Sequence, residues 1–128
     1  MTIDDPMLDL DGEKKAGKVE KRKLLEKDIE NAVCKYARDR YGMKAEKFTS
    51  PGRRAVPDRL FTVPCSRPGG FLFYIEMKAP GKKPTEKQER DHEERRRMGC
   101  KVFVVDDIDR GKKIVDAMYA FAVEQEED

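Results

Sequence analysis

An apolar run that ends in two charges places the strongest constraint on the fold of this chain. Residues 71–75 are all aromatic or aliphatic, and Glu76, Met77 and Lys78 follow directly. This composition is typical of a strand inside a sheet. Because side chains alternate along a strand, Glu76 and Lys78 share one face and Met77 points to the other. Charges at the end of a core strand cost free energy unless the fold uses them, so the run predicts a functional site.

A second strand is expected over residues 57–63, joined to the first by a turn-rich segment. If the turn is centred on Arg67, the hairpin register places Asp58 directly opposite Glu76. Two carboxylates that face each other repel, and a divalent cation between them removes the repulsion. We therefore predict that Asp58, Glu76 and Lys78 converge on one metal-dependent active site. The alternative, a buried ion pair at a strand end, does not explain Asp58.

The remaining elements follow from hydrophobic spacing and turn residues. They are a helix over 24–41 that ends at Gly42, a short strand over 44–50, a helix from Thr85 to about Met98, a strand over 101–106, and a helix from about Asp109 to Glu124. The strand, helix and strand between residues 71 and 106 form a β-α-β unit, whose strands should be parallel. The fold class is therefore α/β, with a small mixed sheet flanked by helices.

The helix that begins after Thr85 is unusually polar. Thr85 and Gln88 have the spacing of a capping box, which by itself explains both residues. Residues 86–97 include no aliphatic or aromatic hydrophobic side chain. The inward face of this helix is expected to use Gln88, His92 and the methylene stem of Arg95. We expect His92 to act as a packing or hydrogen-bonding group rather than as a general base.

Length and charge indicate one domain with two acidic ends. The chain has 128 residues and a net charge of +2, but residues 1–13 carry five acidic side chains and no base, and residues 124–128 carry four. The span between them therefore carries a net charge of +11, which is typical of a protein with a polyanionic partner, nucleic acid first. A solvated charged surface is the alternative, and composition does not decide between the two. We predict a flexible tail over 1–23, a folded domain over 24–123 and an acidic tail over 124–128.

The cysteines and the hydropathy pattern favour a soluble cytoplasmic protein. Cys34, Cys65 and Cys100 are far apart and form no Cys-x-x-Cys pair, which disfavours a zinc site or a disulfide framework. No apolar run approaches the length of a membrane span, and no signal-peptide pattern opens the chain.

The ordered set of motifs resembles the PD-(D/E)XK nuclease superfamily and, more finely, its VRR-NUC family of virus-type replication-repair nucleases. The resemblance covers about residues 24–122. The motifs that carry it are Glu30, Val56-Pro57-Asp58, Glu76-Met77-Lys78, Thr85 with Gln88, and Gly99 before a valine-rich strand. The resemblance implies a restriction-endonuclease-like core and a bacterial or phage-infected cell as the setting.

The family resemblance also implies site roles. It assigns Asp58, Glu76 and the Met77 carbonyl to a Mg²⁺ or Mn²⁺ ion and Lys78 to catalysis. It places Gln88 and Glu30 at the periphery of the catalytic site, with Glu30 reaching the metal through a water. The residues by themselves leave two alternatives open: Glu30 is a surface charge, and Gln88 only caps the helix.

The resemblance to small stand-alone members of the family implies a dimeric enzyme that acts on branched DNA such as four-way (Holliday) junctions, in replication and DNA repair. The expected partners are therefore branched DNA and a second copy of the chain, with no membrane and no organic cofactor. The basic residues expected to contact phosphates are Arg53, Arg54, Lys82, Lys83, Arg95 and Arg96. The alternatives are a nuclease for flaps, ends or RNA, and a non-catalytic DNA-binding module of the same fold.

Overall fold

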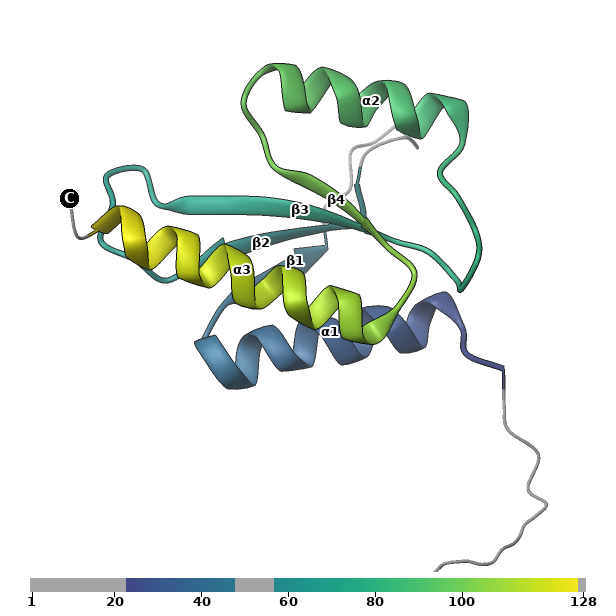
Figure 1. The fold of residues 1–128 in the computed structure, drawn as a ribbon, viewed down its shortest axis with the longest axis horizontal. Coiled ribbons are helices and arrows are strands. Elements are labelled where there is room, and N and C mark those ends of the chain that lie inside the picture. The colour runs from purple at the N-terminus through teal and green to yellow at the C-terminus, as the bar shows by residue number, and fades with distance from the viewer. Residues whose placement is uncertain (1–22, 48–56, 127–128) are drawn as a thin grey trace, which may run out of the picture.

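A four-stranded mixed sheet lies between three helices in the computed structural model, which describes residues 23–47 and 57–126 (Figure 1). In chain order the elements are α1 (Glu26–Tyr41), β1 (Lys44–Lys47), β2 (Arg59–Val63), β3 (Phe71–Met77), α2 (Glu86–Arg97), β4 (Val102–Val105) and α3 (Ile108–Glu126). This order confirms the predicted α/β class. The predictions for Arg53 and Arg54, and for residues 1–22, lie outside the described residues.

The strands follow the spatial order β1-β2-β3-β4. The pairs β1–β2 and β2–β3 are antiparallel, whereas β3 and β4 are parallel, as the β-α-β unit requires. Phe61 faces Phe73 and Arg59 faces Ile75 across the central hairpin. This is the register predicted from a turn centred on Arg67, and it is confirmed.

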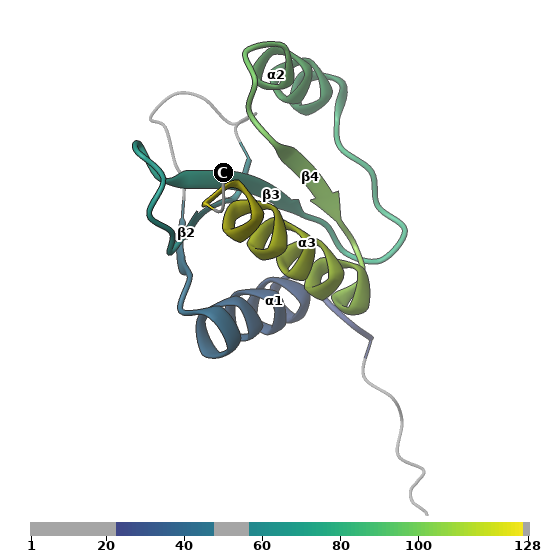
Figure 2. The same ribbon diagram turned by 60° about the vertical axis from the view of Figure 1, so that its left-hand side comes forward.

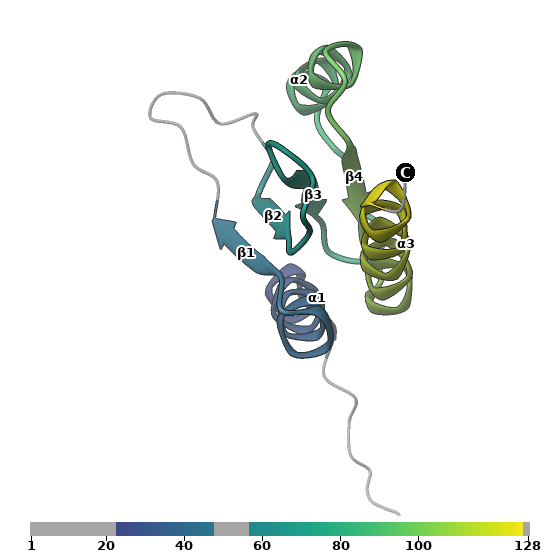
Figure 3. The same ribbon diagram turned by 90° about the vertical axis from the view of Figure 1, so that its left-hand side faces the viewer.

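The two faces of the sheet have different coverings. Phe73, Ile75 and Met77 of β3 are fully buried on the face that α1 and α3 cover, side by side (Figure 3). The Phe61 and Phe73 rings stack there with centroids 4.9 Å apart. The opposite face of β3 carries Glu76, which lies toward α2, and Figure 2 shows that helix well apart from α1 and α3. The alternation of β3 therefore separates an apolar core from a polar face.

Helix α2 packs on that second face almost without hydrophobic side chains. The Arg95 guanidinium lies 5.3 Å from the centre of the Tyr74 ring and donates to Asp91 at 2.8 Å. Arg96 donates two hydrogen bonds, of 3.1 and 2.8 Å, to the carbonyl of Val102 at the start of β4. Arginine stems, a cation–π contact and backbone hydrogen bonds thus replace the usual apolar stripe.

Strand β2 begins two residues later than the sequence suggested, at Arg59 instead of Pro57. Pro57 has no N–H to donate to a ladder. At the next position the side chain of Asp58, and not its backbone, accepts a hydrogen bond from Met77 N–H at 2.8 Å. The backbone pairing of β2 with β3 therefore ends at Arg59, and beyond it the Asp58 carboxylate accepts the hydrogen bond from β3.

Helix α3 extends beyond its expected ends. It starts at Ile108 because the Asp107 carboxylate caps the N–H of Arg110 at 2.8 Å, and it continues to Glu126. The acidic run that was expected as a tail from Glu124 therefore begins inside the helix. No helix within the described residues is both long and apolar enough to cross a membrane.

Gly111 sets the distance of closest approach between α3 and α1. A methyl group added at Gly111 would lie 2.5 Å from Cγ2 of Val33 and 3.2 Å from Cγ1 of Val105. Alanine gains about 1 kcal/mol in helix propensity, but forcing a group into a packed core costs about 1–3 kcal/mol. We expect Gly111→Ala to lower the free energy of unfolding by as much as about 2 kcal/mol in urea titrations.

The contact with Val33 supplies the control. Val33→Ala removes the nearest methyl groups, so Gly111→Ala should be less destabilising in a Val33→Ala background than in the wild type. Strictly additive effects of the two substitutions would contradict this account.

Candidate active site

Two carboxylates meet where β2 begins and β3 ends. Asp58 directly precedes β2, and Glu76 is the penultimate residue of β3. Because Arg59 pairs with Ile75, the next step of the register brings Asp58 to the level of Glu76. The hydrogen bond from Met77 N–H fixes the Asp58 carboxylate against β3. The structure thus brings together the acidic pair that the hairpin predicted.

The electrostatics of Asp58 reflect this crowding. Burial and the nearby charge of Glu76 raise the pKa of Asp58 to about 6, although the hydrogen bond from Met77 N–H opposes the rise. Glu26 and Glu30 add smaller effects in the same direction. Asp58 is therefore costly to ionise beside Glu76 alone, and a divalent cation would stabilise its charge.

Glu76 is almost completely buried, with 2% of its surface exposed. Its Oε2 atom accepts a hydrogen bond from Gln88 Nε2 at 3.1 Å and lies 3.6 Å from Lys78 Nζ. Its Oε1 atom has no hydrogen-bond partner and lies 3.8 Å from His92 Nε2. The carboxylate is thus held on one oxygen, while the other oxygen retains its accepting capacity.

Gln88 combines the two roles that the sequence left open. Its Oε1 atom accepts from Thr85 N–H at 2.9 Å, and its own N–H donates to Thr85 Oγ1 at 3.1 Å, which completes the capping box. Its Nε2 atom points the other way, to Glu76. One amide therefore both starts α2 and connects that helix to the carboxylate.

Lys78 follows β3 directly and has its backbone fixed. Its N–H donates to the carbonyl of Val105 at 2.8 Å, which continues the parallel ladder past Met77. Only 14% of its side chain is exposed, and the ammonium lies beside Glu76. A cation held so close to the acidic pair can stabilise negative charge that develops there.

Glu30 is held by an arginine that sequence reasoning missed. Arg59 Nε donates to Glu30 Oε2 at 2.6 Å, and Arg59 Nη1 donates to the carbonyl of Ala45 at 3.0 Å. Burial raises the pKa of Glu30, but the hydrogen bond and the charge of Arg59 outweigh it and leave this pKa below its usual value. The position of Arg59 on the same face of β2 as Phe61 was the available signal, because a charge on a core face needs a partner.

The predicted phosphate-contacting residues differ in their surroundings. Lys82 and Lys83 are exposed in the loop after β3, close in sequence to Lys78. Arg95 and Arg96 are engaged in packing α2 on the sheet, through Asp91, Tyr74 and the Val102 carbonyl. The loop lysines are therefore the more available groups.

The donor set suits a hard cation. No three His, Cys, Asp or Glu side chains gather as a metal-binding group within residues 23–47 and 57–126, so the candidate centre rests on the two carboxylates. Mg²⁺ is commonly held by one or two carboxylates and keeps several waters. The unpartnered Oε1 of Glu76 and the raised pKa of Asp58 fit such an ion. The Met77 carbonyl and a water-linked Glu30 stay predictions.

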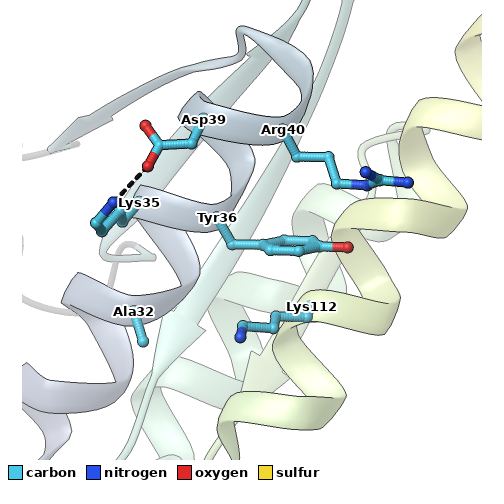
Figure 4. Close-up of a pocket in the computed structure, with 6 residues that line it drawn as sticks. All are labelled: Ala32, Lys35, Tyr36, Asp39, Arg40 and Lys112. Carbon is cyan, nitrogen blue, oxygen red and sulfur yellow. Dashed lines mark hydrogen bonds and ion pairs between the residues drawn. The ribbon is translucent and has the colours of Figure 1, made fainter.

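A pocket of about 410 Å³ lies apart from this site, between α1 and α3 (Figure 4). Its lining residues are Ala32, Lys35, Tyr36, Asp39, Arg40 and Lys112. Lys35 pairs with Asp39 at 2.5 Å, Lys112 Nζ lies 5.2 Å from the Tyr36 ring centre, and the Tyr36 hydroxyl donates to Asp116 at 2.7 Å. The contacts of Tyr36 with Lys112 and Asp116 join the two helices, whereas the Lys35–Asp39 pair lies within α1. None of the predicted site residues lines the pocket.

Two comparisons give clear similarities to known proteins. The chain is 42% identical over 88 residues to "Putative nuclease p44" of Acyrthosiphon pisum secondary endosymbiont phage 1. The aligned region covers 69% of this chain and 89% of that protein. A solved structure described as a VRR_NUC domain superposes with a TM-score of 0.56 at 33% identity, covering 69% of this chain and 95% of that one. No family model matches the sequence.

Proposed function

This chain belongs to the VRR-NUC family of nucleases, and from that premise we propose that it is a divalent-metal-dependent endonuclease that hydrolyses phosphodiester bonds in branched DNA. The observation that carries the proposal is the half-buried Asp58 beside the buried Glu76, with the Lys78 ammonium 3.6 Å from Glu76. Without a bound cation, charged side chains placed this close together at the end of a core strand would cost free energy.

In the proposed reaction, Asp58 and Glu76 hold Mg²⁺ or Mn²⁺. Such an ion would supply an activated water and charge compensation for the scissile phosphate. Lys78 orients the attacking water or stabilises the charge that develops on the phosphate oxygens. Gln88 fixes the Glu76 carboxylate through its Nε2 atom, and Glu30 stays at the periphery, beside Arg59.

The proposed substrate is DNA, in accordance with the basic span between the acidic ends of the chain. Lys82 and Lys83 are exposed in the loop four and five residues after Lys78 and are suited to phosphate contacts. A four-way junction has two-fold symmetry, so paired incisions suit a homodimer. Sedimentation at working concentrations tests this feature separately, and a monomer at all concentrations would count against junction resolution.

The deciding experiment is a cleavage assay with linear, flap, splayed and four-way DNA, in Mg²⁺, in Mn²⁺ and in EDTA. We expect cleavage that needs the ion and is fastest on the four-way substrate. Substrates with blocked ends separate endonuclease from exonuclease activity, and an RNA set tests that alternative. Binding without cleavage in any divalent ion would instead indicate a non-catalytic DNA-binding module.

The two roles of Gln88 can be separated by substitution. Gln88→Glu retains a capping oxygen for Thr85 N–H but replaces the amide donor with a second carboxylate beside Glu76. We expect cleavage to fall by about 10–100-fold, the usual effect of losing a group that orients a metal ligand. Multiple-turnover rates and thermal unfolding measure the two roles.

Thr85→Ala is the matched control, because it removes the capping hydroxyl and leaves the bond to Glu76. It should lower the free energy of unfolding by about 1 kcal/mol with little change in cleavage. Equal losses of activity in both variants would assign Gln88 to helix capping alone.

A further inference from the structure

His92 is a buried polar side chain with no apparent structural role. It is fully buried on α2, and neither Nδ1 nor Nε2 has a hydrogen-bond partner. Among the described residues, only one other side chain besides Glu76, that of Arg67, has a buried polar atom without a hydrogen-bond partner. A buried unsatisfied polar group costs about 1–3 kcal/mol, so its retention in the core needs an explanation.

The surroundings of His92 supply one. Its Nε2 atom lies 3.8 Å from Glu76 Oε1, the carboxylate oxygen that also lacks a partner. Gln88, one helical turn earlier on the same face of α2, already donates to Glu76 Oε2. Gln88 and His92 are thus neighbours on one face of α2, and each lies beside a different oxygen of the Glu76 carboxylate.

We propose that His92 is a positioning residue for Glu76: once the divalent ion is bound, His92 donates from Nε2 to Oε1, which lies 3.8 Å away in the metal-free structure, and so fixes the plane of the carboxylate. The inference rests on the proposed function, since it concerns the same metal site. A carboxylate offers about four lone-pair sites, so a donor on each oxygen still leaves lone pairs for the cation. Outer hydrogen bonds of this kind orient metal ligands and raise affinity.

A role in packing alone makes a different prediction, which defines the test. His92→Leu fills a similar volume but has no donor, whereas His92→Gln extends an amide nitrogen toward the position of Nε2. Mn²⁺ affinity is measured by isothermal titration calorimetry without DNA, and thermal unfolding is measured without metal. We expect about 10–100-fold weaker Mn²⁺ binding in His92→Leu and near wild-type binding in His92→Gln.

Metal-free His92→Leu should unfold at a temperature no lower than the wild type, because it removes two buried nitrogens that lack partners. Glu93→Gln, at the neighbouring exposed position of α2, is the control and should bind Mn²⁺ like the wild type. Wild-type affinity in His92→Leu, or weak binding in both His92 variants, would overturn the inference. If the wild type itself binds no Mn²⁺, the proposed function fails instead.

A second pair of variants tests the proposal if His92→Leu does not fold. His92→Asn places its amide nitrogen near the Nδ1 position, one atom too short to reach Glu76, whereas His92→Gln reaches it. Tighter Mn²⁺ binding by the glutamine variant supports the proposal. Equal binding by the two amide variants contradicts it.

Discussion

Replacement of Asp58 by asparagine is expected to lower metal-dependent DNA cleavage by about a thousandfold or more. Metal-ion catalysis supplies several kcal/mol of transition-state stabilisation, and each 1.4 kcal/mol is about tenfold in rate. The neutral amide can still accept the Met77 N–H, so the fold at the end of β3 should persist. Single-turnover rates with saturating DNA, over a range of Mg²⁺ concentrations, measure the loss. Glu76→Gln should behave in the same way.

Asp39→Asn is the matched control, because it makes the same chemical change at an exposed ion pair on α1. Such pairs contribute about 0.3–0.5 kcal/mol, so cleavage should be unchanged. Full activity of Asp58→Asn in Mg²⁺ would contradict the assignment of the metal site.

The pKa of Asp58 adds a test of the metal-free protein. This pKa is raised to about 6 in the fold, so the folded state holds the proton more tightly than the unfolded state, whose Asp pKa is about 3.9. The contribution of Asp58 to the stability of the wild type should therefore fall as the pH rises from about 4 to about 6, and stay lower above that. Asp58→Asn should remove this fall and be the more stable protein at pH 8. Urea titrations at several pH values measure it, and identical pH profiles would show that Asp58 does not titrate as described.

Lys78→Met is expected to reduce the rate of cleavage by about 10²–10⁴-fold while metal binding persists, because the loss falls on proton transfer or charge stabilisation. Methionine matches the lysine side chain as far as Cε and lacks only the ammonium, and the backbone bond to Val105 is unaffected. Lys78→Arg should restore little, since the planar guanidinium cannot replace a compact ammonium in a confined site. Single-turnover cleavage and Mn²⁺ calorimetry separate chemistry from binding.

Lys82→Met, four residues along in the exposed loop, is the control for charge alone. It should weaken DNA binding in a salt-dependent manner and leave the single-turnover rate at saturating DNA close to that of the wild type. If both lysine variants showed the same modest defect, Lys78 would be one more phosphate contact.

The hairpin was predictable from the sequence because two constraints agreed. The alternation of residues 71–77 fixes which side chains enter the core, and the turn around Arg67 fixes the pairing of Phe61 with Phe73. A slip of one residue would have moved Glu76 to the core face. The approach of Asp58 and Glu76 follows from the register, so the residue pattern alone was enough to predict it.

The packing of α2 and the partner of Glu30 were harder to predict. Hydrophobic periodicity cannot place a helix whose contacts are an arginine stem on Tyr74 and guanidinium bonds to a backbone carbonyl. The link between Glu30 and Arg59 joins residues on different elements, and only the three-dimensional fold brings them together. The unpartnered nitrogens of His92 likewise become visible only when every neighbour is known.

The contact between the first and last helices has a consequence for synthesis on the ribosome. Tyr41 of α1 stacks on Tyr119 of α3 at 4.2 Å, and Val33 packs over Gly111. Until α3 leaves the exit tunnel, the apolar surface of α1 and of the sheet stays uncovered, although the residues proposed to hold the metal have already been translated. A nascent nuclease of this design should therefore gain its cutting activity late, after the last helix has been translated and has docked.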